Sequence, residues 1–188
     1  MAQATDPRPA ALIVAHGSPS APDEQERALA ELAAKVGARL DGWRVSSATL
    51  AKPGRFEAEC ARLGRPLIYP FFMAEGWFTR KILARKANDL DLSMLHPFGV
   101  EPALEPTAAR LLGGCLTARG WRAAETDLLI AAHGSAASRT SSDSALAFAA
   151  GLQRRCGFRS VCTGFVEEPP FLKDAARGLG PQAICLSY

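Results

Sequence analysis

The sequence predicts an α/β fold of two similar lobes, each with a parallel sheet flanked by helices, of which the second lobe is incomplete. Short apolar runs that stop at polar turns alternate with amphipathic segments, which is typical of buried parallel strands joined by crossover helices. Two of these runs are nearly identical, ALIVAHGS at residues 11–18 and LLIAAHGS at residues 128–135. This repetition indicates a duplicated β-α-β-α-β unit.

The repeat continues beyond the two His-Gly-Ser runs. Aligning His16 with His133 brings later segments into register after a slip of one residue. The matched pairs are Val45 with Val161, Pro53 with Pro169, Gly64 with Gly180, and Phe72 with Tyr188. The predicted first lobe, with a linker helix, is residues 1–121, and the second is residues 122–188. The second lobe holds no counterpart of residues 73–121.

Strand and helix alternate along the first lobe. Residues 22–40 carry an apolar stripe at helical spacing, and acidic Asp23 and Glu24 stabilise the first turn of such a helix. A second helix is predicted from Phe56 to the Gly64 turn, and Thr79 is the predicted N-cap of a basic helix. The predicted strands are the apolar run before His16 and residues 45–50, 67–72 and 93–95.

A long helix at residues 104–118 is predicted to link the lobes. The second lobe then repeats the same order, with helices at residues 144–155 and about 170–177. Its final strand, residues 183–188, is apolar, and no following segment is available to cover it. Because an uncovered strand favours association, we expect a homodimer or another protein contact there.

Composition indicates a globular protein. The chain of 188 residues is 48% hydrophobic, which is ample for a packed core, and its net charge is only +3. This charge carries no nucleic-acid signature. No apolar run reaches the length of a membrane span, and the N-terminus lacks the apolar core of a signal peptide. We expect a soluble, cytoplasmic protein without nucleic-acid or membrane partners.

The five cysteines show no metal or disulfide pattern. None forms a CxxC pair, and an odd number argues against a disulfide framework. We expect them to pack as small buried hydrophobes. They are Cys60, Cys115, Cys156, Cys162 and Cys185.

All three histidines fall at predicted strand ends. His16 and His133 follow the two repeated strands, and His96 follows the short strand at residues 93–95. Ligands of open α/β sheets bind at the carboxyl ends of the strands. A histidine there can act as a general base, bind a metal or satisfy a core carbonyl. We take His16 and His133 as candidate catalytic residues and all three as candidate metal ligands.

Other polar residues follow the same strand ends. A carboxylate beside a neutral histidine can bind a divalent metal or relay protons. Glu75 follows the third strand, and the pair Glu167 and Glu168 follows the strand that contains Val161. We take Glu75 and Glu167 as candidate metal ligands. The candidate residues for binding a polyanionic ligand are Ser18, Ser135, Arg80 and Lys81.

The His-Gly-Ser turns match no common catalytic loop. They lack the spacing of a Walker P-loop or a GxGxxG fingerprint, so no nucleotide cofactor is expected. The absence of a GxSxG elbow argues against serine hydrolysis. Anion binding or phosphoryl transfer by His16 and the two serines is a more distant alternative, which assays with generic phosphate esters would test.

Four stretches together resemble the class II tetrapyrrole chelatases, the sirohydrochlorin cobaltochelatases and ferrochelatases of cobalamin and sirohaem biosynthesis. They are LIVAHGS, ATLAKPG, PFFMAEGWFTRKIL, and the second AAHGS with GFVEEPP. The resemblance covers nearly the whole chain. It implies two facing lobes, a cleft for a flat macrocycle, and insertion of Co²⁺, Fe²⁺ or Ni²⁺ without ATP. His16 matches the family's first active-site histidine, and His133 matches it in the second lobe.

The chain departs from the family in the loop after the third strand. Family members usually carry a second histidine there, in a Gly-x-His arrangement, whereas this loop contains Gly76, Trp77 and Phe78. Phenylalanine can neither bind a metal nor accept a proton, so a first-lobe site would use His96, Glu75 or His133 instead.

Our leading hypothesis is a metal chelatase, a lyase, whose substrates are a divalent metal, Co²⁺ above all, and a sirohydrochlorin-type tetrapyrrole. In it His16 and His133 act as bases or metal ligands. The rival hypothesis is a non-catalytic protein of the same fold that binds a tetrapyrrole or a metal.

Overall fold

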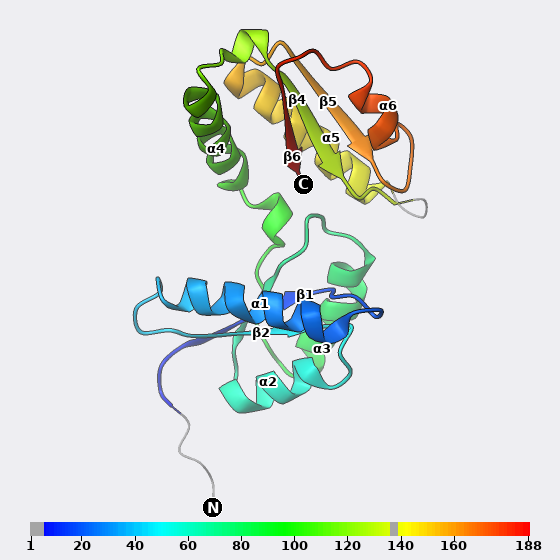
Figure 1. Cartoon of the computed structure of the whole chain (residues 1–188). Helices are drawn as coiled ribbons and strands as arrows, with labels where there is room; N and C mark the ends of the chain where they lie inside the picture. Colours follow the sequence, from blue (N-terminus) through cyan, green and yellow to red (C-terminus); the bar gives the residue numbers. More distant parts are fainter. Residues whose placement is uncertain (1–5, 136–138) are drawn as a thin grey trace, which may run out of the picture. The chain divides into compact units, whose positions relative to one another are not determined.

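Each half of the chain forms a three-stranded parallel sheet whose central strand is followed directly by a His-Gly-Ser turn (Figure 1). The computed structural model describes residues 6–135 and 139–188. They fall into two compact units, the first ending at Phe98 and the second starting at Gly99. The predicted α/β class with two lobes is therefore confirmed.

The first sheet has the strand order β2-β1-β3. Successive side chains of a strand point to opposite faces of its sheet. Leu12 and Val14 of β1 lie in one core, and Ile13 lies in the other. Burial on both faces explains the continuous apolar run before His16. The strands are β1 (Ala10–Ala15), β2 (Arg44–Thr49) and β3 (Leu67–Pro70).

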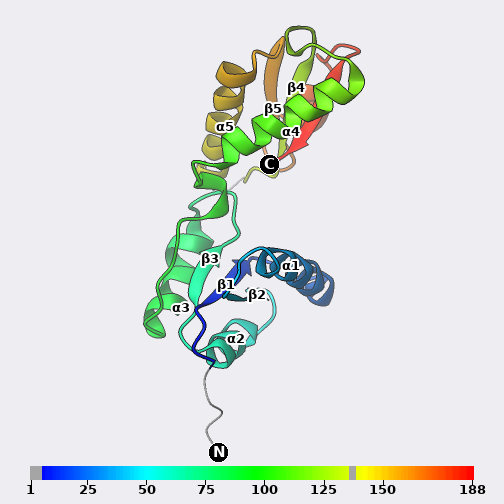
Figure 2. The same ribbon diagram turned by 90° about the vertical axis from the view of Figure 1, so that its left-hand side faces the viewer.

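Helices cover both faces of this first sheet (Figure 2). Leu29 of α1 packs against Ile13 on one face. Phe56 of α2 and Ala87 of α3 pack with Leu12 on the other. The helices are α1 (Pro22–Gly37), α2 (Arg55–Leu63) and α3 (Ala84–Asp89).

The predicted fourth strand at residues 93–95 is reduced to a single bridge. Ile68 of β3 pairs in parallel with Met94. The Ile68 N–H donates to the Ser93 carbonyl at 2.9 Å, and the Leu95 N–H donates to the Ile68 carbonyl at 2.9 Å. This segment therefore extends the sheet beside β3, and His96 follows directly after it.

The second unit has the equivalent strand order, β5-β4-β6. Ala10 pairs with Arg44 in the first sheet and Asp127 with Ser160 in the second. The second pair is one residue closer in sequence, which is the slip that the alignment required. The strands are β4 (Asp127–Ala132), β5 (Ser160–Phe165) and β6 (Ala183–Ser187).

The register of the last strand corrects one detail of the alignment, which matched Tyr188 with Phe72. The Tyr188 N–H donates to the Ala131 carbonyl at 2.8 Å, as the Phe71 N–H donates to the Val14 carbonyl at 2.7 Å. Tyr188 therefore corresponds to Phe71. The second unit has one additional residue between β5 and β6, and this residue cancels the earlier slip.

Helix α4 belongs to the second unit, although the sequence placed it with the first lobe. Its Leu112 shares a core with Leu128 of β4 and Leu152 of α5, and Figure 2 shows α4 crossing the face of the second sheet. The units consequently divide after Phe98, whereas the sequence predicted a boundary after residue 121. The helices are α4 (Leu104–Arg119), α5 (Thr140–Cys156) and α6 (Leu172–Ala176).

One face of β6 is covered within its own unit. Ile184 and Leu186 pack against the core that α4 and α5 close. Cys185 and Ser187, which alternate with them, are exposed. The predicted homodimer would have to use this second face, and it stays a prediction.

Two expectations from composition can be compared with the structure. Burial raises the pKa of the Cys60 thiol to about 11, in line with a packing role. The other cysteines are not fully buried. Cys115, Cys156 and Cys162 are partly exposed, and Cys185 is exposed on the open face of β6, so the expectation of five buried cysteines holds for Cys60 alone. No helix among the described residues is long and apolar enough to cross a membrane.

A buried carboxylate fixes the amino end of β4. Asp127 is 2% exposed. Its oxygens accept hydrogen bonds from Arg159 Nε at 2.8 Å, the Gly180 N–H at 2.7 Å and Ser160 Oγ at 2.8 Å. These donors, Arg159 first, hold the pKa of the Asp127 carboxyl well below its usual range. One side chain thus ties β4 to β5 and to the segment before β6.

Candidate functional site

The first His-Gly-Ser turn is held against the end of β2. His16 follows β1 and is exposed. Gly17 has a φ of +76°, and a Cβ atom there would lie 2.7 Å from Thr49 Cβ, so this position requires glycine. The Ala51 N–H donates to the His16 carbonyl at 2.9 Å. The backbone of the turn is therefore fixed, while the imidazole remains accessible.

A π-helical turn, η1 (Phe78–Leu83), follows the loop after β3. The Ala84 N–H donates to the Thr79 carbonyl five residues back, the bond that defines this geometry. Thr79 lies inside the helix, and its hydroxyl donates to the Gly76 carbonyl at 2.9 Å. The predicted N-cap role of Thr79 is therefore wrong. Single π turns are rare and are frequent at functional sites.

The π turn presents Phe78 to His16. The two ring centroids are 4.1 Å apart, and the ring planes meet at 51°. Trp77 meets Phe78 edge-on with centroids 5.2 Å apart, and Trp77 is 62% exposed. We call Trp77 and Phe78 the aromatic shelf. An exposed aromatic surface beside an accessible imidazole suits the stacking of a flat ligand.

The structure brings three of the predicted residues together after β3. Glu75 Oε2 accepts a hydrogen bond from Arg80 at 3.0 Å, and Glu75 Oε1 lies 3.4 Å from His96 Nδ1. The Arg80 guanidinium and then His96 hold the pKa of the Glu75 carboxyl below its usual value. Lys81 is exposed on the same helix. Glu75 and His96 therefore form a carboxylate–imidazole pair, and Arg80 is engaged by that carboxylate.

The second His-Gly-Ser turn is organised by two glutamates. His133 Nε2 lies 3.1 Å from Glu167 Oε1, and both side chains are more than half exposed. Glu168 Oε1 accepts the Ser135 N–H at 2.8 Å. A Cβ atom at Gly134, whose φ is +73°, would lie 2.9 Å from that same oxygen. The structure thus places the candidate Glu167 beside His133, whereas Glu168 supports the turn.

The two predicted serines, Ser18 and Ser135, are not members of these imidazole–carboxylate pairs. Ser18 Oγ lies 2.8 Å from Ser20 Oγ, a contact within the exposed loop. Ser135 is anchored through its backbone. Among the described residues, no three His, Cys, Asp or Glu side chains gather to hold a metal ion. Each unit therefore offers one imidazole–carboxylate pair, and the first unit also holds one imidazole against an aromatic ring.

Sequence reasoning missed Glu26, a buried carboxylate behind the first turn. Glu26 is 8% exposed and bonds Thr49 at the end of β2. A signal was present, because Glu26 falls on the buried stripe of α1 that continues through Leu29 and Ala33. An acidic residue on an apolar helical stripe indicates a buried partner.

Replacing Phe78 with histidine is expected to create a metal-binding pair in the first unit. Two imidazoles facing each other at the present ring separation can share a Co²⁺ or Ni²⁺ ion, because imidazole suits these metals. We expect the F78H protein to bind Co²⁺ at least about tenfold more tightly, or roughly 1.4 kcal/mol, by isothermal titration calorimetry.

The matched control is Trp77→His, which places an imidazole one residue earlier, at a position that contacts Phe78. It should leave Co²⁺ affinity unchanged. An equal increase in Co²⁺ affinity in the two variants would show that the position of residue 78 beside His16 is not what creates the metal-binding pair.

Two solved structures are similar to nearly the whole chain. One is CbiX, the terminal enzyme for biosynthesis of siroheme in denitrifying bacteria. It is 43% identical, with a TM-score of 0.84, and the match covers 96% of this chain and 78% of that one. The other is SirB from Bacillus subtilis with Fe³⁺. It is 16% identical, with a TM-score of 0.70, and the match covers 96% of this chain and 76% of that one. This second likeness shows the fold alone. Neither a protein-family model nor a curated protein matches the chain.

Proposed function

Because this chain belongs to the class II tetrapyrrole chelatases, we propose that it is a lyase that inserts a divalent metal ion into a sirohydrochlorin-type tetrapyrrole. The observation that carries this proposal is the 43% identity to CbiX over 96% of the chain. The product is an intermediate or end product of sirohaem or cobalamin biosynthesis. Sirohaem contains iron, which favours Fe²⁺, whereas the sequence resemblance favours Co²⁺.

The imidazole of His16 can perform the chemistry that this reaction needs. Insertion removes two protons from pyrrole nitrogens and replaces the water ligands of the metal. A neutral imidazole can accept a proton or bind a divalent metal of borderline softness. In our proposal His16 performs one of these steps while the macrocycle stacks on the aromatic shelf of Trp77 and Phe78.

His133 and Glu167 offer the same chemistry in the second unit. If His133 donates its Nε2 proton to Glu167, 3.1 Å away, its Nδ1 atom is left as an acceptor for a metal or a proton. We propose His133 as a second base or metal ligand and Glu167 as its partner.

The same reasoning assigns auxiliary roles to other residues in the first unit. Glu75 and His96 form a pair that can take up a metal ion, and Lys81 offers an exposed cation to the carboxylates of the substrate. Arg80 can join Lys81 only by sharing or leaving its bond to Glu75.

The direct test is to incubate the protein with sirohydrochlorin and Co²⁺, Fe²⁺ or Ni²⁺ without ATP and to follow the change in the absorbance spectrum. We expect insertion of at least one metal well above the uncatalysed rate measured with boiled protein. Rates equal to that background for all three metals would contradict an enzymatic role.

A second candidate is a non-catalytic protein that binds a tetrapyrrole or a metal, and the position of Phe78 beside His16 favours it. The family histidine of that loop is replaced by a ring that cannot bind a metal. Stoichiometric quenching of the protein's tryptophan fluorescence by sirohydrochlorin, without spectral conversion when metal is added, would identify this role.

A further inference from the structure

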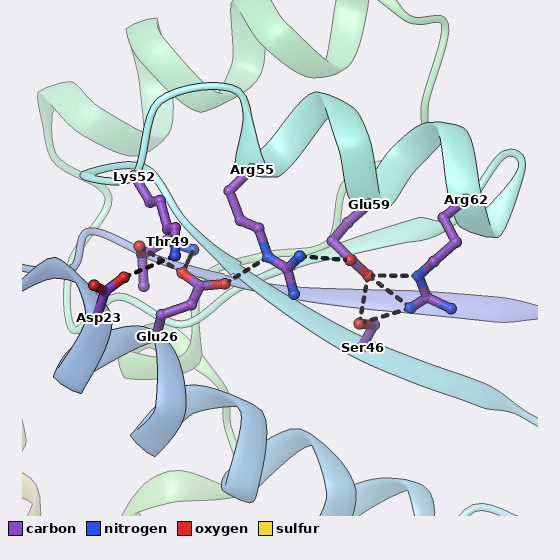
Figure 3. A network of polar contacts seen from close by, with 8 residues as sticks. All are labelled: Asp23, Glu26, Ser46, Thr49, Lys52, Arg55, Glu59 and Arg62. Atoms are coloured by element: carbon purple, nitrogen blue, oxygen red, sulfur yellow. Dashed lines mark hydrogen bonds and ion pairs between the residues drawn. The ribbon is translucent and has the colours of Figure 1, made fainter.

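A buried carboxylate lies directly behind the first His-Gly-Ser turn, in a network shown in Figure 3. Glu26 Oε2 accepts two hydrogen bonds from Thr49, one from the backbone N–H at 2.9 Å and one from Oγ1 at 2.7 Å. Glu26 comes from α1 and Thr49 is the last residue of β2. A single oxygen thus fixes both the backbone and the side chain at this strand end.

Thr49 in turn supports the residue that follows His16. Thr49 Cβ is the nearest atom to the position that a Cβ of Gly17 would occupy, at 2.7 Å, and the next residues of the chain bond the same turn. Leu50 N–H donates to the Ala15 carbonyl, and Ala51 N–H donates to the His16 carbonyl, each at 2.9 Å. A displacement of Thr49 would therefore move the backbone of His16.

The other oxygen of Glu26 ties this support to helix α2. Arg55 Nε donates to Glu26 Oε1 at 2.9 Å, and another nitrogen of Arg55 lies 3.1 Å from Glu59 Oε1. Glu59 is also buried, and it accepts bonds from Ser46 and Arg62 (Figure 3). Two buried glutamates thus share one guanidinium, but only Glu26 contacts the strand end behind His16.

The second unit supports its turn with a carboxylate from a different position. Phe165 occupies the place of Thr49 and approaches Gly134 in the same way, but its side chain has no hydroxyl and its backbone N–H donates to the Pro170 carbonyl at 2.9 Å. There Glu168 accepts the Ser135 N–H directly. Each His-Gly-Ser turn therefore has its own carboxylate support.

We infer that Glu26 is a positioning residue for His16. Through Thr49 it holds the turn so that the imidazole rests against Phe78, and it thereby sets the orientation of His16 for chelation. The kinetic part of this inference rests on the proposed function, whereas the structural part does not.

The structural part can be tested by NMR of the histidine rings, because the chain contains only three histidines. The Phe78 ring, 4.1 Å from His16, shifts the His16 ring protons, and the Phe78→Leu protein calibrates the full size of that shift. We expect Glu26→Ala to remove more than half of the shift that Phe78 causes in the His16 ring protons, while the His96 and His133 signals stay unchanged. Glu26→Gln should keep most of it, because one amide oxygen can accept both Thr49 bonds.

Glu59→Ala is the matched control, since it removes the other buried glutamate on Arg55 without touching Thr49. It should leave the His16 signal in place. If Glu26→Ala does not fold, Thr49→Val removes only the Oγ1 bond and should lose part of the shift. An unchanged His16 signal in Glu26→Ala or Thr49→Val, or an equal shift in Glu59→Ala, would overturn the inference.

The kinetic part predicts a lower kcat in Glu26→Ala by about ten- to a hundredfold, with KM unchanged, because small displacements of a catalytic group have effects of this size. Glu26→Gln should restore most of the rate, and Glu59→Ala should change it less than about twofold. A normal kcat in a Glu26→Ala protein with a displaced His16 would overturn the kinetic part. If the wild type inserts no metal, the proposed function fails while the NMR result still decides the positioning role.

Discussion

The His16→Ala protein is expected to insert metal about 10²- to 10⁴-fold more slowly than the wild type, the range typical for loss of a general acid or base. His16 is the exposed group at the end of β1, and its neighbour Phe78 can replace it neither as a base nor as a ligand. The initial rate of spectral conversion of sirohydrochlorin at saturating metal measures the effect.

The control for this loss is Trp43→Ala, which removes an exposed ring just before β2, at the opposite end of the strands. It should retain the wild-type rate. Added imidazole should partly rescue His16→Ala if the residue acts as a base. If His16→Ala keeps full activity and His133→Ala loses it, the reactive imidazole belongs to the second unit.

The Asp127→Ala protein is expected to lose about 3 kcal/mol of unfolding free energy, because removing one partner of a buried ion pair leaves its donors unpaired. Arg159, Ser160 and the Gly180 N–H all depend on this carboxylate. Arg159 is about half exposed, so water compensates part of the loss. Urea unfolding followed by circular dichroism measures the difference.

The same carboxylate predicts a dependence of stability on pH. The pKa of Asp127 is lowered in the folded protein, so its contribution is complete above the pKa of an unfolded aspartate, about 4, and declines as the pH falls further. The difference in stability between wild type and Asp127→Ala should therefore shrink below pH 4. Asp174→Ala, which breaks an exposed pair with Arg177, should cost less than about 0.5 kcal/mol at any pH.

The strands and both His-Gly-Ser turns could be predicted because their signals are local. A buried parallel strand needs a continuous apolar run, and the turn at Gly17 needs glycine, so both leave a direct mark on the sequence. The sequence also placed His133 and Glu167 at the ends of neighbouring strands as separate candidates, and the structure brings the two side chains together.

Other features depend on packing that the sequence does not display. The segment that begins at Phe78 carries ordinary helix-forming residues, so its π geometry and the contact with His16 could not be predicted. Helix α4 follows the first unit in the chain, and only its burial against β4 assigns it to the second. The role of Glu26 required knowing that α1 places it beside Thr49.

The π turn contains one residue more than an α-helix would need between Thr79 and Ala84. Its defining bond spans five residues, so loss of one codon between these two would let the same donor and acceptor form the four-residue bond of an α-helix. The segments on either side would keep their relative orientation, and Phe78 would still face His16. The same deletion in an ordinary α-helix would rotate the two segments by about 100° relative to each other. The aromatic shelf is therefore expected to tolerate the loss of one residue at this turn.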